Sequence, residues 1–126
     1  MDLSVVIPLY NEEESLPKLV AWIDRVATPA GFEHEIIMVD DGSRDRSWEI
    51  VQDLSTTFPA IRGIRFQRNY GKSAALHVGF QAAKGDVVIT MDADMQDSPD
   101  EIPELYRMIM EEDYDLVSGW KKERHD

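Results

Sequence analysis

The feature that most constrains the fold is a regular alternation of short apolar runs with amphipathic segments. The apolar, often β-branched runs occupy residues 3–7, 36–39, 61–66, 87–91 and 114–118. Between them, apolar residues recur at a spacing of three and four, the period of a helix that buries one face. Repeated strand–helix units with short connections predict right-handed crossovers and a mainly parallel sheet with helices on both faces. At 126 residues, the chain is expected to form a single α/β domain.

Signals for helix ends support this assignment. Asn11 is expected to cap the first helix, with Pro17 still near its first turn. The third helix is expected to run from about residue 72 to 84. The last helix is expected to begin at residues 98–101 (Ser-Pro-Asp-Glu), a capping box with proline at the first helical position.

Composition narrows the possible functions. The 13 basic and 25 acidic residues give a net charge of -12, which disfavours binding to the phosphate backbone of nucleic acids. The absence of cysteine excludes disulfides and thiolate metal sites. No apolar run approaches the roughly 20 residues that span a bilayer, and the N-terminus lacks the basic region of a signal peptide. We therefore expect a soluble, cytoplasmic chain.

Polar side chains follow three of the apolar runs, in residues 8–12, 40–43 and 92–97. Parallel strands bring their carboxyl ends to one edge of a sheet, and that edge is where such folds bind ligands. We expect these three segments to converge on one cleft.

Asp92 and Asp94 form the most specific of these patterns. Two carboxylates separated by one small residue can share Mg²⁺ or Mn²⁺ with the oxygens of a diphosphate. Such a cation also stabilises charge on a departing nucleoside diphosphate. An isolated Asp-x-Asp is common in solvated turns, but its position after a buried strand, beside a second acidic strand end, favours the metal site.

The segment Asp40-Asp41-Gly42-Ser43 combines a structural and a functional interpretation. Gly42 allows a tight turn, and Ser43 or Asp45 can cap the following helix. One of the two carboxylates could also accept a hydrogen bond from a base N–H or a ribose hydroxyl.

The remaining candidates are open to either interpretation. Tyr10 could stack on a base or serve in packing, and Glu12 could be an acid favoured by a helix N-terminus. Lys72 lies at the start of a helix, which is a natural anion site. A P-loop is excluded because Phe66 stands where that motif needs glycine, and the first strand is not followed by the glycine-rich dinucleotide fingerprint.

Four segments in order, residues 8–12, 39–43, 68–72 and 91–97, resemble the motifs of family 2 glycosyltransferases. The closest similarity is to polyprenyl-phosphate glycosyltransferases of the dolichol-phosphate mannose synthase and bactoprenol glucosyltransferase type, and it covers almost the whole chain. The resemblance implies a GT-A fold and metal-dependent, inverting transfer of a hexose from a UDP- or GDP-sugar. The acceptor would be a polyprenyl phosphate at the cytoplasmic face of the membrane, in membrane or cell-wall glycan synthesis.

The resemblance also implies roles for individual residues. The implied substrate-binding residues are Pro8, Tyr10, Glu12, Asp40, Asp41, Lys72, Asp92, Ala93 and Asp94, and the implied metal ligands are Asp92, Asp94 and Gln96. Among them, Asp40 would meet the base, with Asp41 beside it, and Lys72 would lie near the donor.

In the resembled family, the general base and the acceptor-binding half lie beyond the point that corresponds to Asp126. Residues 1–126 are therefore expected to form the nucleotide-sugar-binding part, without a catalytic base and inactive alone. An exposed sheet edge could support a homo-oligomer.

Two other classes of protein compete with this interpretation. A receiver-like signalling module would place its acidic pair after the first strand, where this chain has Pro8-Leu9-Tyr10-Asn11-Glu12. A nucleotidyltransferase would need a glycine-rich loop at the same place.

Overall fold

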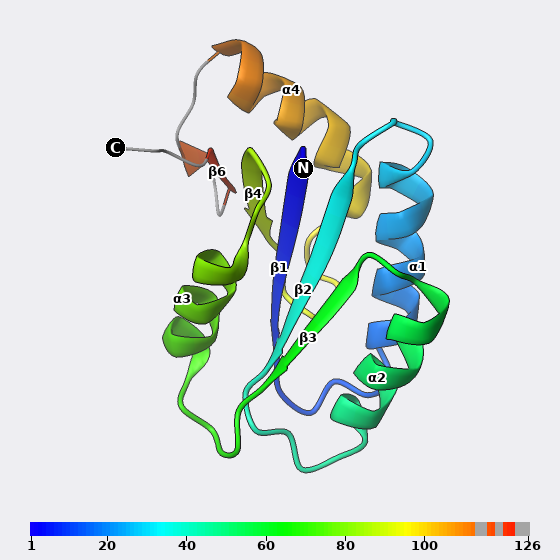
Figure 1. The fold of residues 1–126 in the computed structure, drawn as a ribbon, viewed down its shortest axis with the longest axis vertical. Helices are drawn as coiled ribbons and strands as arrows, with labels where there is room; N and C mark the ends of the chain where they lie inside the picture. Colours follow the sequence, from blue (N-terminus) through cyan, green and yellow to red (C-terminus); the bar gives the residue numbers. More distant parts are fainter. Residues whose placement is uncertain (113–115, 118–119, 123–126) are drawn as a thin grey trace.

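The computed structural model describes residues 1–112, 116–117 and 120–122, and it shows an α/β fold built on one sheet (Figure 1). In chain order the elements are β1 (Leu3–Leu9), α1 (Leu16–Ala27), β2 (His34–Asp40), α2 (Ser47–Thr57), β3 (Ile61–Arg65), α3 (Lys72–Ala82), β4 (Val87–Thr90), the 3₁₀ helix η1 (Pro99–Glu101), α4 (Ile102–Glu112), β5 (Leu116–Val117) and β6 (Trp120–Lys122).

The sheet has the strand order β3-β2-β1-β4-β6-β5. The first four of these strands are parallel, with Leu9 of β1 opposite Asp40 of β2 and Val6 of β1 opposite Thr90 of β4. Strand β6 pairs antiparallel with both β4 and β5. The expected mainly parallel sheet is confirmed, and it brings the carboxyl ends of β1, β2 and β4 to the same edge.

The C-terminal part of the sheet differs from the sequence prediction. Of the strand expected over residues 114–118, Leu116 and Val117 form β5, and residues 114, 115 and 118 lie outside the described residues. Strand β6 was not predicted, because it is only three residues long and two of these are lysines.

Helices cover both faces of the sheet, as expected. Helices α1, α2 and α4 pack on one face, and α3 packs on the other (Figure 1). Alternate residues of β1 pack on opposite faces of the sheet. Val5 and Ile7 belong to the larger core, while Val6 packs with Ala75 of α3. Strands buried on both faces explain why their sequences are continuously apolar.

Two of the expected helix ends need correction. Helix α1 begins at Leu16, and Asn11 does not cap it, because the Asn11 Oδ1 instead accepts hydrogen bonds from the backbone N–H groups of Arg44 and Asp45. The residues expected to start the last helix form η1, where Pro99 takes the first position but no side chain caps the turn.

A buried carboxylate joins the elements at the amino edge of the sheet. Glu35, 2% exposed, accepts hydrogen bonds from the Arg62 guanidinium at 2.7 Å, from Ser4 Oγ at 2.6 Å and from the Lys84 backbone N–H at 2.7 Å. Burial raises the pKa of the Glu35 carboxyl, but these hydrogen bonds and the charge of Arg62 outweigh it, so the pKa lies below its usual value. One side chain thus ties together β1, β2, β3 and the connection from α3 to β4.

Candidate functional site

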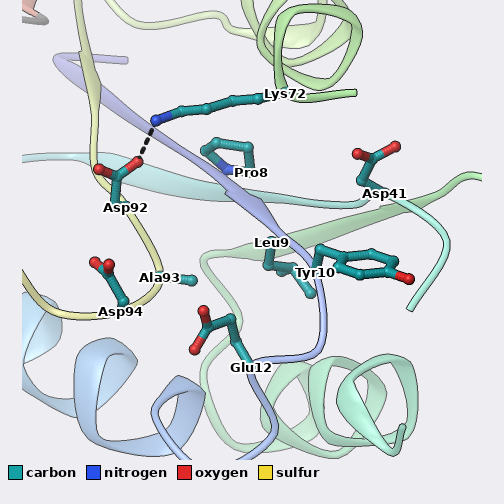
Figure 2. A pocket seen from close by; sticks show the side chains of 9 residues that line it. All are labelled: Pro8, Leu9, Tyr10, Glu12, Asp41, Lys72, Asp92, Ala93 and Asp94. Carbon is teal, nitrogen blue, oxygen red and sulfur yellow. Dashed lines mark hydrogen bonds and ion pairs between the residues drawn. The ribbon is translucent and has the colours of Figure 1, made fainter. Parts of the chain in front are cut away.

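A pocket of about 270 Å³ opens at the carboxyl edge of the parallel strands (Figure 2). Its lining residues are Pro8, Leu9, Tyr10, Glu12, Asp41, Lys72, Asp92, Ala93 and Asp94. They come from the ends of β1, β2 and β4 and from the start of α3. The three polar segments therefore converge on one cleft, as the strand order requires.

Eight of the nine residues that the resemblance implied as substrate-binding line this pocket. Leu9 also lines it and was missed by the sequence analysis. The available signal was its position as the last residue of a buried strand, where an apolar side chain can form the floor of a cleft. Asp40 and Gln96 are not among the lining residues.

The neighbouring Asp40 and Asp41 lie in different environments. Asp40 is fully buried, and its Oδ1 accepts a hydrogen bond from the Ser43 N–H at 2.8 Å, which closes the turn after β2. The Asp40 Oδ2 is buried without a hydrogen-bond partner among the described residues. Asp41 is 5% exposed and lines the pocket.

The Asp41 carboxylate holds the loop that precedes α3. Its Oδ1 accepts the Tyr70 N–H at 2.7 Å, and its Oδ2 accepts the Gly71 N–H at 3.1 Å. Gly42 lets this loop lie close to the turn after β2, because a Cβ on residue 42 would lie 2.4 Å from the carbonyl carbon of Arg68. These contacts hold the loop in a position that places Lys72, the first residue of α3, at the pocket.

Lys72 and Asp92 form an ion pair across the pocket. The Lys72 Nζ lies 2.6 Å from the Asp92 Oδ1, and the dashed line in Figure 2 marks this contact. Both side chains are partly exposed, at 62% and 38%. Lys72 is the only cation among the lining residues and faces four acidic ones, so the pocket has a net negative charge.

Hydrogen bonds fix the loop after β1 against the start of α2. The Glu12 N–H donates to Ser47 Oγ at 2.9 Å, and the Glu13 N–H donates to Asp45 Oδ2 at 3.3 Å. Asp45 also accepts the N–H of Ser47, the first residue of α2, but neither Ser43 nor Asp45 is the cap of this helix as predicted, because the cap position is held by Arg46, whose side chain makes no cap hydrogen bond. Burial raises the pKa of the Asp45 carboxyl, but the hydrogen bonds from Ser47 and Glu13 outweigh it and lower the pKa.

The loop after β4 carries the two carboxylates expected to bind metal. Within it, the Asp92 N–H donates to Asp97 Oδ2 at 3.2 Å, and the Gln96 N–H donates to Asp94 Oδ1 at 3.2 Å. Met95, between Asp94 and Gln96, has a φ of 67°, so the backbone takes the left-handed conformation at this point of the loop.

Asp92 and Asp94 fit a cation that is completed by a ligand's own oxygens. Across the described residues, no group of three or more histidine, aspartate or glutamate side chains is placed to hold a metal. Mg²⁺ is commonly bound by only one or two carboxylates together with the phosphates of a substrate. Asp92 and Asp94 both line the pocket and provide that minimum, whereas Gln96, the third expected ligand, is not among the lining residues.

Known proteins resemble this chain over nearly all its length. Residues 4–125 match the Glycosyl transferase family 2 model. The undecaprenyl-phosphate 4-deoxy-4-formamido-L-arabinose transferase of Aeromonas hydrophila subsp. hydrophila is 43% identical over 125 residues, which is 98% of this chain and 38% of that protein. The transferase of the same name from Pseudomonas aeruginosa (strain LESB58) is 45% identical, over 98% and 37%. The chain thus spans less than two fifths of these relatives.

Solved structures show the same fold. S. aureus TarS 1-349 in complex with UDP superimposes with a TM-score of 0.77 and 25% identity, over 91% of this chain and 34% of TarS 1-349. The mannosyltransferase PcManGT from Pyrobaculum calidifontis, in complex with GDP-Man and Mn²⁺, gives a TM-score of 0.67 and 28% identity, over 73% of this chain and 27% of that protein. The GT-A-type fold is confirmed, although the chain covers only part of it.

None of the helices in the described part of the chain is long and apolar enough to cross a membrane.

The family match extends over almost every residue and excludes the receiver-like and nucleotidyltransferase alternatives. The chain belongs to glycosyl transferase family 2.

Proposed function

We propose that this chain forms the donor and metal site of a glycosyltransferase that moves a sugar from a UDP-sugar to a polyprenyl phosphate. The observation that carries this proposal is the pocket at the strand ends. It gathers the base-facing, phosphate-facing and metal-facing candidates within one cleft of a family 2 domain. The acceptor half is proposed to come from the part of the relatives' length that this chain does not span.

The sugar is proposed to be 4-deoxy-4-formamido-L-arabinose. The relatives from Aeromonas hydrophila and Pseudomonas aeruginosa are named as transferases of this sugar to undecaprenyl phosphate. This sugar is a pentose derivative, so we propose a pentose and not the hexose that was expected from the sequence. UDP is favoured as the carrier because TarS, which superimposes better than PcManGT, is in complex with UDP. The reaction would take place at the cytoplasmic membrane face, with inversion at the anomeric carbon.

The pocket suggests how each part of the donor would be held. Asp41 is the better candidate than Asp40 to accept a hydrogen bond from the base, because only Asp41 lines the pocket. Tyr10, which lines the pocket and is 40% exposed, would cover the base or ribose. The Lys72 ammonium would meet a phosphate oxygen, and its charge would favour departure of the nucleoside diphosphate.

Asp92 and Asp94, with Gln96, would hold the divalent cation. When bound, that cation would supply charge neutralisation for the diphosphate. Without it, the acidic side chains of the pocket would repel the donor, since like charges about 4 Å apart repel by roughly 4 kcal/mol near a protein surface.

Isothermal titration calorimetry of UDP and GDP, with Mn²⁺ and then with excess EDTA, tests the proposal. We expect UDP to bind more tightly than GDP, and EDTA to weaken UDP binding at least tenfold. Equal binding of the two nucleotides would contradict base recognition. Binding that survives EDTA would contradict the metal site.

A further inference from the structure

Ser15 precedes α1 but does not cap it. Serine is a favoured residue at this position because its side-chain oxygen usually accepts a backbone N–H of the first turn. Here the side chain makes no cap hydrogen bond. Its Oγ lies 2.6 Å from the carbonyl oxygen of Ala93, 78 residues further along the chain.

The distances indicate which acceptor takes the hydroxyl proton. Ser15 Oγ also lies 3.1 Å from Glu12 Oε2 and 3.3 Å from the Glu12 carbonyl oxygen. A serine hydroxyl has a single proton to donate. The contact to the Ala93 carbonyl is the shortest of the three and falls at the usual length of an O–H···O hydrogen bond.

The position of this carbonyl in the loop after β4 gives the contact its importance. Ala93 stands between Asp92 and Asp94, so holding its peptide group orients both carboxylates. The hydrogen bonds from Asp92 to Asp97 and from Gln96 to Asp94 are internal to the loop and define its shape. The position of the loop relative to the rest of the fold depends on other contacts, which include the burial of the Ala93 side chain in the core.

Besides the packing of Ala93 and Met95 on the core, two polar contacts among the described residues join residues 92–97 to segments outside the loop, one from Lys72 and one from Ser15. The ion pair between Lys72 and Asp92 uses the same carboxylate that a cation would use, so a bound cation and diphosphate would compete with it. The hydrogen bond from Ser15 goes to the backbone and is free of this competition. Ser15 is also rigidly placed, because the adjacent Leu16 and the nearby Leu19 are fully buried.

We propose that Ser15 is a positioning residue that aims Asp92 and Asp94 at one shared cation. This inference rests on the proposed function, in which these carboxylates bind the metal of the donor complex. Ser15 acts through the Ala93 carbonyl and touches neither donor nor metal. A loop left free to shift would still carry both carboxylates, but less often with their oxygens directed at the same point.

The test compares Ser15→Thr with Ser15→Val in the full chain. The two side chains have nearly the same shape, and only threonine keeps the hydroxyl. UDP affinity is measured by calorimetry with and without Mn²⁺, and free Mn²⁺ is followed by electron paramagnetic resonance. A net hydrogen bond of ordinary strength corresponds to roughly a 3- to 10-fold change in affinity. We expect Ser15→Val to reduce the gain in UDP affinity on adding Mn²⁺ by about this factor, and Ser15→Thr to retain the gain.

Ser55→Ala is the matched control. The Ser55 hydroxyl also donates to a backbone carbonyl at 2.6 Å, but this carbonyl belongs to Gln52 in α2 and not to a residue that lines the pocket. This variant should keep both the metal-free and the Mn²⁺-dependent affinity. Thermal melting without ligand shows whether each variant is folded.

Three results would overturn the inference. If Ser15→Val keeps the full Mn²⁺ gain while the unmodified protein shows one, positioning by Ser15 is wrong and the proposed function stands. If Ser15→Thr loses the gain as completely as Ser15→Val, the hydroxyl is not the cause. If the unmodified protein gains no affinity from Mn²⁺, the proposed metal site fails, and the role of Ser15 fails with it.

Discussion

At the scale of single residues, two adjacent aspartates show how position decides role. Asp40 is the last residue of β2 and is fully buried, whereas the next residue, Asp41, lines the pocket. Successive side chains of an extended strand point to opposite sides. The residue pattern left either carboxylate open, and the resemblance implied that Asp40 meets the base. Which of the two lines the pocket depends on the exact end of the strand, which the sequence does not give.

The two aspartates give a matched pair of substitutions. Asp41→Asn should weaken UDP binding about tenfold, because the pocket loses a charged acceptor and the new amide group faces the Gly71 N–H. Asp40→Asn should change UDP binding less than twofold, since an amide oxygen can still accept the Ser43 N–H. Calorimetry on both variants checks this. A larger loss of binding for Asp40→Asn would return the base-reading role to Asp40.

Lys72 should matter for binding and not for stability. Exposed ion pairs typically contribute about 0–1 kcal/mol, and both partners of this pair are partly exposed. Lys72→Met should therefore leave the free energy of unfolding nearly unchanged but lower UDP affinity about 10- to 100-fold, as expected when a charged hydrogen bond to phosphate is lost.

Urea unfolding and calorimetry separate the two effects of Lys72→Met. Lys84→Met serves as the control, since Lys84 is exposed and lies just after α3, at its end remote from Lys72. Equal losses of UDP affinity in the two variants would indicate a general charge effect and contradict a specific role for Lys72.

At the scale of elements, periodicity predicted the helices and the four parallel strands, while the ends of elements were harder to predict. Asn11 has the residue type of a helix cap, but tertiary hydrogen bonds to the loop after β2 use its side chain instead. Strand β6 has too few residues to show a period. The first miss arises because contacts between distant segments override local preference, and the second because so short a strand carries no periodic signal.

The loop after β2 depends on a close backbone approach that only glycine permits. A Cβ on Gly42 would lie within 2.8 Å of three backbone atoms of Arg68 and Asn69, and its φ of 78° also disfavours other residues. Gly42→Ala should lower the free energy of unfolding by about 2–4 kcal/mol, because both strain and steric overlap arise. It should also weaken UDP binding, because the Cβ would displace the loop before α3, which leads into Lys72.

Gly31→Ala separates these two contributions. Gly31 has a similar φ of 82°, but a Cβ there meets nothing within 4 Å. This control should cost only about 1 kcal/mol, the strain of the left-handed backbone. Urea denaturation of the two variants measures the difference, and equal losses of stability would mean that the close approach at Gly42 is unimportant.

At the scale of the whole molecule, stability should depend on pH through Glu35. Its pKa in the folded protein lies below the ordinary value of 4.5. A lowered folded-state pKa contributes stability that is complete above about pH 5 and is lost as pH falls through the folded-state value. Glu35→Gln should therefore lower the free energy of unfolding by about 1–3 kcal/mol at pH 7 and by much less at pH 3. Urea unfolding at the two pH values checks this, and an equal loss at both would contradict the charged role of Glu35.

The contacts of Glu35 also have a consequence for folding kinetics. They bridge 31, 27 and 49 residues of sequence, to Ser4, Arg62 and Lys84. Closing such loops costs chain entropy before any contact forms, so this carboxylate can be satisfied only after β1, β2, β3 and the end of α3 have assembled. Its bonds should then be absent from the folding transition state, and Glu35→Gln should speed unfolding while leaving the refolding rate nearly unchanged. The carboxylate would determine how long each folded molecule persists, and not how quickly the fold is reached.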